Sequence, residues 1–209
     1  MAAWEDERGL IALRWRTGAD WVDLVLADPL ELLDDHAHCE LGAAAAAQSF
    51  LARHPSINRV AEKLSATAIE ELRHFRTVHA LLHELGGTLS SRGPNAYVEG
   101  LQAAVRASRT AEGDPLVDRL LVAALIERRS LERFELLARR AGGRLGDLYR
   151  ELAPSELGHA ALFVHLCFEI RGEALAVPRL LELQELEARV AREQTRGARI
   201  HSGFAERAA

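Results

Sequence analysis

Cysteine, proline, lysine and aromatic residues are all scarce in this sequence of 209 residues. The two cysteines, Cys39 and Cys167, lie far apart without CxxC spacing, so neither a disulfide framework nor a structural zinc site is indicated. We expect both to behave as small core hydrophobes. No apolar run reaches the roughly 18 residues that a membrane span needs, and the first residues, MAAWEDERG, are too acidic for a signal peptide. These absences predict a cytoplasmic protein.

The abundant residue types favour helices. Hydrophobic residues make up 48% of the chain and are mainly Leu and Ala, whereas β-branched residues are sparse and only 6 prolines occur. The composition therefore predicts an all-α protein, and the length fits a single domain over residues 1–209. A net charge of −5 argues against a surface wholly adapted to nucleic acid but leaves room for a local basic patch.

Apolar residues recur at helical spacing in four long segments, bounded by Pro and by Gly pairs. We expect helices at about 22–52, 57–85, 115–140 and 144–170. Ser56 is a candidate N-cap for the second helix, and Asp114-Pro115 reads as N-cap and first residue of the third. Residues 86–114 form the longest connection, with a helical piece at about 95–108, and are long enough to cross a bundle.

Two further segments flank the four helices. Residues 1–20 are expected to form an arm or short helix, with Trp4, Trp15 and Trp21 as anchoring aromatics. Residues 177–209 should form a last helix and a tail, the helix running over about 178–196 and starting at Pro178.

The motif Glu-x-x-His occurs twice, as Glu71-Leu72-Arg73-His74 and as Glu156-Leu157-Gly158-His159. Residues three apart project from one face of a helix, so each motif can offer a carboxylate and an imidazole to one metal ion. A single match is common by chance, so the motif predicts a metal site only where other candidate ligands lie on neighbouring helices.

Glu40 and Glu127 are such additional candidates. They lie on helical stripes otherwise made of Ala, Leu and Phe, where an unpaired carboxylate is costly. Glu71 follows Glu40 by 31 residues and Glu156 follows Glu127 by 29, so two similar hairpins each supply a lone Glu and then Glu-x-x-His. This pattern is typical of ferritin-like four-helix bundles with two iron or manganese ions. We predict two iron ions, held by Glu40, Glu71, His74, Glu127, Glu156 and His159.

Neighbouring polar residues are expected to remain outside the site. Glu70 lies one residue off the stripe, and Glu132, Glu135 and Arg139 form a separate face that should be solvated. Five histidines lack matching partners and are predicted to be non-ligands: His36, His38, His79, His83 and His165. Ala44, Ala47 and Phe75 are possible neighbours of a substrate pocket by helical phase, although plain core packing is the simpler reading.

Several blocks of the chain resemble the tRNA 2-methylthio-N6-isopentenyladenosine hydroxylases, the MiaE type. These blocks span residues 17–204 and comprise ADWVDLVLADPLELLDDHAHCELGAAAAA around Glu40, EELRHF at the first motif, RGPNAY at 92–97, LIERRSLERF around Glu127, SELGHA at the second motif and ARIHSGF at 198–204. The resemblance implies a non-haem di-iron monooxygenase that uses dioxygen and an external electron-transfer reductase. Its implied substrate is the isopentenyl side chain of a hypermodified adenosine beside the tRNA anticodon.

A tRNA substrate predicts a basic rim, because RNA-binding proteins meet phosphates as well as unstacked loop bases. The candidate arginines are Arg128, Arg129, Arg133, Arg139, Arg140, Arg144 and Arg150 on the outer side of the third helix and the following turn, and Arg189, Arg192, Arg196 and Arg199 near the C-terminal end. An ordinary solvated face offset by nearby Glu is the alternative for both groups.

The sequence is compatible with three other functions. A ferritin-like ferroxidase and a rubrerythrin-like peroxidase would use the same ligands, although the second commonly has a rubredoxin module whose cysteines are missing here. A metal-free helical interaction protein would have to bury four carboxylates without a cation. The sequence does not determine the oligomeric state.

Overall fold

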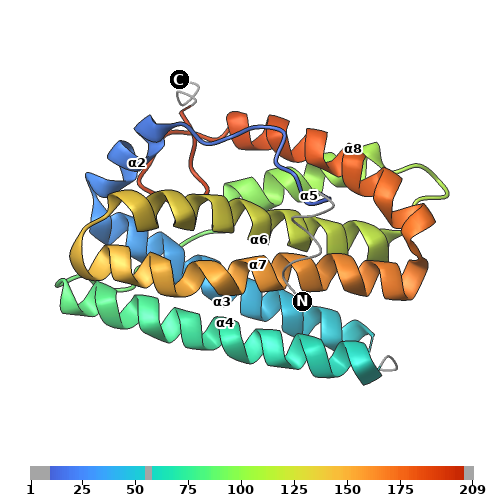
Figure 1. The fold of residues 1–209 in the computed structure, drawn as a ribbon, viewed down its shortest axis with the longest axis horizontal. Coiled ribbons are helices and arrows are strands. Elements are labelled where there is room, and N and C mark those ends of the chain that lie inside the picture. Colours follow the sequence, from blue (N-terminus) through green and yellow to red (C-terminus); the bar gives the residue numbers. More distant parts are fainter. Residues whose placement is uncertain (1–9, 55–57, 205–209) are drawn as a thin grey trace.

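Four long helices form two antiparallel hairpins that pack into one bundle (Figure 1). The computed structural model describes residues 10–54 and 58–204. Helix α3 (Pro29–Arg53) packs along α4 (Asn58–Glu84), and α6 (Pro115–Arg140) packs along α7 (Gly143–Arg171). Within the described residues all regular elements are helices, so the all-α, ferritin-like bundle predicted from the sequence is confirmed.

The connection between the two hairpins contains α5 (Ala96–Ser108), which pairs with α8 (Glu173–Arg192) on one side of α6 (Figure 1). The predicted long crossover and additional terminal helix are therefore present. Asn95 caps α5 by accepting hydrogen bonds from the backbone N–H groups of Tyr97 and Val98, at 3.1 and 3.3 Å. Asp114 caps α6 through the N–H of Leu116 at 2.8 Å, as the Asp-Pro pair predicts.

Two predicted helix boundaries are wrong. The segment expected as one helix over 22–52 is divided into α2 (Ala19–Leu26) and α3, because Asp28 caps a new helix whose first residue is Pro29. The last helix starts at Glu173 instead of Pro178, directly after Gly172, whose φ of +82° ends α7 and redirects the chain. Ser56 and Trp4 lie outside the described residues, so their predicted roles are untested.

The bundle interior contains two apolar clusters along its length. One joins α5, α6, α7 and α8, and the other joins α2 with the opposite end of the four-helix bundle and the C-terminal segment. Trp21 is fully buried in the second cluster, as expected of an anchoring aromatic. None of the described helices has the length and apolar composition needed to cross a membrane.

Candidate metal centre

The six predicted metal ligands meet in the interior of the four-helix bundle. Glu40 comes from α3, Glu71 and His74 from α4, Glu127 from α6, and Glu156 and His159 from α7. Each is between 1% and 8% exposed. We call these six residues the carboxylate–histidine cluster.

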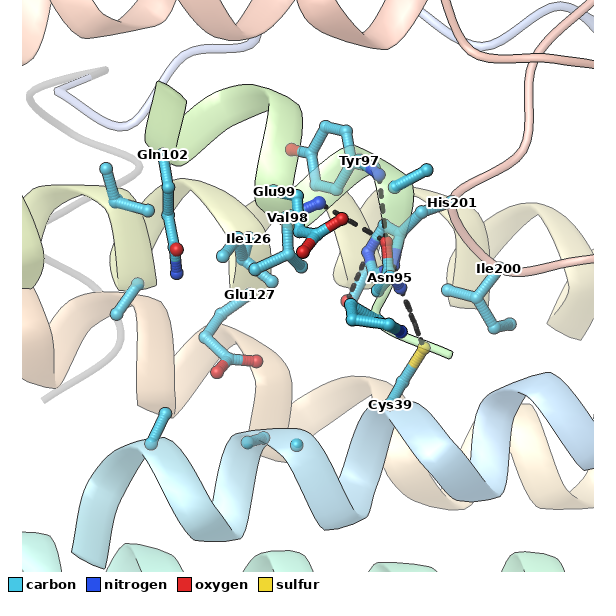
Figure 2. A pocket seen from close by; sticks show the side chains of 18 of the residues that line it. Cys39, Asn95, Tyr97, Val98, Glu99, Gln102, Ile126, Glu127, Ile200 and His201 are labelled. Carbon is cyan, nitrogen blue, oxygen red and sulfur yellow. Dashed lines mark hydrogen bonds between the residues drawn. The ribbon is translucent and has the colours of Figure 1, made fainter. Parts of the chain in front are cut away.

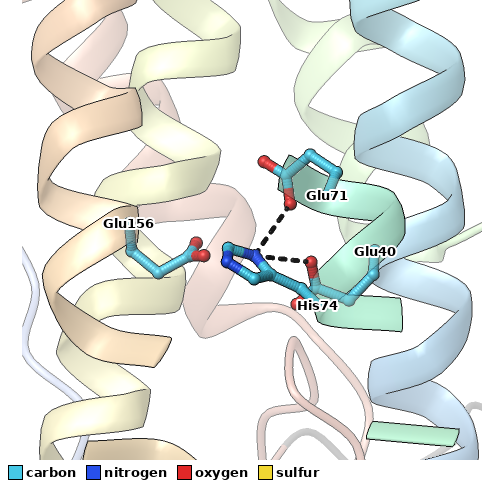
Figure 3. Close-up of side chains that lie close together, drawn as sticks. All are labelled: Glu40, Glu71, His74 and Glu156. Carbon is cyan, nitrogen blue, oxygen red and sulfur yellow. Dashed lines mark ion pairs between the residues drawn. The ribbon is translucent and has the colours of Figure 1, made fainter. Parts of the chain in front are cut away.

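Ligand atoms of the cluster fall into two groups, each within 4.8 Å of one another. One group contains Glu40, Glu71, His74 and Glu156 (Figure 3), and the other contains Glu71, Glu127 and His159. Since Glu71 belongs to both, its two oxygens can serve two neighbouring cations. The side chains that the helical spacing predicts to face inward therefore lie close together in the structure.

Both histidines direct Nδ1 toward carboxylates of the cluster. His74 Nδ1 lies 3.6 Å from Glu40 Oε2 and 3.4 Å from Glu71 Oε2, as Figure 3 shows. His159 Nδ1 lies 2.8 Å from Glu71 Oε1. The inward nitrogen of each ring is therefore the one available to a metal.

The outer nitrogens are held by the residue that precedes each Glu-x-x-His motif on the opposite helix. His159 Nε2 donates to Glu70 Oε2 at 3.2 Å, and His74 Nε2 lies 3.3 Å from Ser155 Oγ. Ser155 already donates to the Leu152 carbonyl, so it accepts from His74. Such partners orient a ligating imidazole and fix its tautomer. Glu70 is outside the ligand groups, as predicted, but its role was missed because it depends on a neighbouring helix.

His36 is likewise outside the ligand groups but contacts one of the predicted ligands directly. Its Nε2 lies 2.6 Å from Glu40 Oε1, and its ring stacks on Tyr149 with centroids 5.4 Å apart. His36 therefore holds one oxygen of Glu40, while the other oxygen faces His74.

Burial and mutual repulsion perturb the carboxyl groups of the metal-free cluster. Burial and then the charge of Glu71 raise the pKa of Glu127 to about 7. Burial, Glu127 and Glu40 raise the pKa of Glu156 well above its ordinary value, so Glu156 is protonated and donates to Glu127. Burial opposes ionisation of Glu40 as well, but hydrogen bonds from His36 and His74 lower its pKa.

The pKa values of the two histidines of the cluster are raised as well, and for a histidine a raised pKa favours the charged form. Burial alone would lower the pKa of His74, but hydrogen bonds to Glu40 and Glu71 raise it to about 10. Burial also disfavours the charged form of His159, and Glu71 more than compensates, raising that pKa to about 9. Two imidazolium ions thus supply positive charge to the acidic cluster.

Divalent cations fit this arrangement of donors. Within the cluster, four buried polar atoms have no partner in hydrogen-bond geometry among the described residues, although both histidine nitrogens make ion-pair contacts: Glu71 Oε1, His74 Nδ1, Glu156 Oε1 and His159 Nδ1. Leaving such atoms unsatisfied is costly, and metal coordination would satisfy all four. Four carboxylates and two imidazoles suit two divalent ions, iron among them.

A cleft of about 1010 Å³ reaches the cluster from between α3, α5 and α6 and is lined by Glu40, Glu71, Glu127 and Glu156. Its apolar wall is made of Ala43, Ala46, Ala47, Phe50, Val122, Ala123, Ile126 and Phe163. Ala47 is therefore a pocket residue as well as a buried one, whereas Ala44 and Phe75 are absent from the lining. The cleft gives a small apolar group access to the predicted metal site.

The opposite wall is polar and includes a residue from the C-terminal segment (Figure 2). His201 Nδ1 faces Asn95 Nδ2 at 3.3 Å and Cys39 Sγ at 3.8 Å, and its ring stacks on Tyr97. Burial, Arg133 and Arg129 lower its pKa well below the ordinary value, so His201 is neutral. Cys39 therefore lines the cleft, while Cys167 is buried in the core as predicted.

The predicted outer face of α6 is partly wrong. Arg129 and Arg133 are buried, not solvated. Glu132 is also buried, where it accepts hydrogen bonds from Arg129 and from the Thr17 hydroxyl, the latter at 2.7 Å. Arg129 also pairs with buried Glu187 of α8, 2.8 Å away. Because α8 and the N-terminal arm cover this side of α6, its charged residues form a buried network.

Comparisons with known proteins agree on one family. Residues 8–202 match the family model described as tRNA-(MS[2]IO[6]A)-hydroxylase (MiaE). A tRNA 2-(methylsulfanyl)-N(6)-isopentenyladenosine(37) hydroxylase of Pseudomonas putida KT2440 is 34% identical over 185 residues, 88% of each chain. The Salmonella typhimurium LT2 protein of the same name is 33% identical over 134 residues, 64% of this chain and 48% of that protein.

A solved structure supports the fold comparison. It is described as Protein 43 with aldehyde deformylating oxygenase activity from Synechococcus, and is 34% identical with a TM-score of 0.82. The match covers 94% of this chain and 98% of the other. The whole bundle, with its crossover and terminal helices, is therefore shared.

Proposed function

Because this chain belongs to the MiaE family of tRNA hydroxylases, we propose that it hydroxylates the isopentenyl side chain of 2-methylthio-N6-isopentenyladenosine beside the tRNA anticodon. The match to the family over residues 8–202 is the observation on which this assignment rests. The buried carboxylate–histidine cluster at the end of an apolar cleft is compatible with oxygenase chemistry. With tRNA as substrate, the proposed place of action is the cytoplasm.

The proposed ligands of two iron ions are the six residues of the cluster. When bound, the irons would supply dioxygen activation and C–H oxidation, with electrons from an external reductase. Glu71 is proposed to serve both ions, since its oxygens belong to both ligand groups. Glu70 and Ser155 hold the outer nitrogens of His159 and His74, so the proton that a neutral ring keeps is on the outer nitrogen and the inward nitrogens are the ones that would coordinate metal.

The apolar wall of the cleft is proposed to hold the prenyl group. Ala43, Ala46 and Ala47 present small side chains toward the cleft, which leaves space beside Glu40 and Glu127. Ile126, the neighbour of Glu127 on α6, limits that space beside the cluster, and Phe50 lines the outer part of the cleft. The protein thereby directs one C–H bond toward the metal centre instead of leaving the side chain free to rotate.

Nucleoside analysis of tRNA tests the substrate. Cells that lack the gene should accumulate the prenylated precursor and lose its hydroxylated product, and a plasmid copy should restore the product. Unchanged levels of the hydroxylated nucleoside, in a host that makes the precursor, would refute the assignment.

Iron stoichiometry tests the ligand set separately. Glu127→Ala and His159→Ala should abolish or halve the bound iron, whereas His79→Ala, on the same bundle but outside the cluster, should leave it unchanged. Retention of about two irons per chain in the first two variants would show that the ligands lie elsewhere.

A second candidate substrate is an aldehyde, favoured by the activity in the description of the Synechococcus protein. The apolar wall of the cleft is compatible with an alkyl chain. Incubation of iron-loaded protein with an aldehyde and a reducing system should then yield the shortened hydrocarbon. Ferroxidase and peroxidase activities of the same bundle are measured with the same preparation, by iron oxidation and by peroxide consumption.

A further inference from the structure

Three arginines near the end of the bundle where α3 finishes and α6 begins form ion pairs with carboxylates. Arg109 Nε lies 2.6 Å from Asp118, Arg179 Nε lies 2.7 Å from the same carboxylate, and Arg171 Nε lies 2.5 Å from Asp114. The negative charge of the carboxylate offsets the positive charge of the guanidinium, so such a pair attracts an external anion only weakly. These three arginines therefore link neighbouring segments of the bundle to one another.

Three arginines at the same end differ. Arg53 ends α3, Arg106 lies in the last turn of α5, and Arg119 lies in the first part of α6. All three line the cleft, and none forms an ion pair with a carboxylate in the part of the chain that the structure describes. We call Arg53, Arg106 and Arg119 the basic mouth.

Two of these guanidinium groups repel each other. Burial and then the positive charge of Arg53 lower the pKa of Arg119. The Arg119 guanidinium carbon lies 5.6 Å from the ring centroid of Phe50, a residue of the apolar wall. Two like charges held together without a nearby acid are unfavourable by themselves, and an anion between them would relieve the repulsion.

Few acidic groups compete at this opening. Of the carboxylates that line the cleft, Glu99 alone is exposed, and the others are buried in the carboxylate–histidine cluster or beside arginines. The unpaired positive charge at the mouth therefore faces solvent and any ligand that enters.

The distance between the basic mouth and the carboxylate–histidine cluster suits a nucleotide whose base enters the cleft. Arg119 and Glu127 are eight residues apart on α6, which corresponds to about 12 Å along the helix axis. An anion held at the mouth would leave a base and its side chain to extend along the apolar wall toward Glu127. A phosphate attached to the nucleotide that enters the cleft satisfies this geometry.

We infer that Arg53, Arg106 and Arg119 bind the phosphodiester backbone of the RNA strand that presents its modified base to the cleft. This inference rests on the proposed tRNA hydroxylase function and assigns the RNA contact to the cleft opening. Arginine suits such a contact because its planar group can donate two hydrogen bonds to one phosphate. Of the arginines predicted on the outer side of α6, Arg129 and Arg133 are buried and cannot contact RNA.

RNA binding of single variants tests the inference. The probe is a synthetic anticodon stem-loop RNA, and its affinity is measured by fluorescence anisotropy over a series of salt concentrations. Arg53→Ala and Arg119→Ala should each weaken binding roughly three- to tenfold and reduce the slope of log affinity against log salt by about 0.7 to 0.9. Arg119→Lys should retain most of the slope, since Lys also contacts phosphate as a charge.

Arg76→Ala is the matched control, because Arg76 is exposed on α4, lies outside the cleft lining and forms no ion pair with another described residue. It should bind RNA like the unmodified protein. Thermal melting establishes that each variant is folded, and Arg106→Ala provides a further test if either of the first two is unstable.

The possible failures are distinguishable. If the unmodified protein binds the stem-loop but Arg53→Ala and Arg119→Ala match Arg76→Ala in affinity and salt slope, the basic mouth is overturned and the tRNA function stands. If the unmodified protein does not bind the stem-loop at all, both the basic mouth and the proposed tRNA function are overturned. Turnover of the free modified nucleoside, which has no phosphate, should be the same in the control Arg76→Ala as in the unmodified protein.

Discussion

Loading of the carboxylate–histidine cluster with divalent metal should release about three to four protons per chain at pH 7. Without metal, both imidazoles are charged at that pH, because the pKa of His74 is about 10 and that of His159 is about 9. Glu156 holds a proton since its pKa is raised well above the ordinary value, and Glu127, with a pKa of about 7, is half protonated. Coordination requires neutral imidazoles and ionised carboxylates, so these protons must leave.

The number of protons bound with and without metal determines how metal affinity depends on pH. The metal-bound state contains fewer protons than the metal-free state, so metal affinity rises with pH. Near pH 7 the overall constant for binding both ions should rise by about three to four orders of magnitude per pH unit, one for each proton released. The rise should level off as pH passes about 10, where His74 has lost its proton. Acid should empty the site.

Calorimetric titration of metal-free protein with Co²⁺ or Zn²⁺, which avoid redox reactions, measures the proton release when it is repeated in buffers of different ionisation enthalpy. His79→Gln, outside the cluster, should release the same number of protons. Glu127→Gln should release about half a proton fewer at pH 7, the share of that carboxyl group. Release of fewer than one proton by the unmodified protein would refute the assignment of charges.

Three further predictions concern residues around the cluster. Glu70→Gln should weaken metal binding about 10- to 100-fold, measured by competition with a chelator, because His159 loses the carboxylate that holds its outer nitrogen. Arg129→Met should lower the free energy of unfolding by about 3–5 kcal/mol in urea, since it leaves Glu187 fully buried without its charged partner. Burial raises the pKa of the Cys39 thiol well above its usual range, so the folded protein should react slowly with a disulfide reagent at pH 7 and quickly in denaturant.

Each of these has a result that would contradict it. Unchanged metal affinity in Glu70→Gln would mean that the outer hydrogen bond does not orient the ligand. A urea midpoint for Arg129→Met equal to that of the unmodified protein would mean that the buried ion pair contributes no net stability. Rapid thiol reaction at pH 7 before unfolding would mean that the cleft wall opens readily.

The sequence determined the helices and the residues that share a face within each of them. Glu40, Glu71 and Glu127 were placed correctly because helical phase is a local property, fixed by 3.6 residues per turn. The cap at Asp114 was equally readable, since a side chain and the next turn of backbone suffice to form it. Pro29 was missed as a helix start because the apolar pattern continues across it.

Only the tertiary structure decided what surrounds each face. Glu70 and Ser155 hold histidines of the opposite helix, and His201 reaches the cleft from the C-terminal segment, so no local pattern specifies these contacts. Arg129 and Glu132 have the spacing of a solvated helix face and are buried, because α8 and the N-terminal arm pack over them. Periodicity identifies neighbours along one helix, but the burial and the partners of a side chain depend on segments distant in sequence.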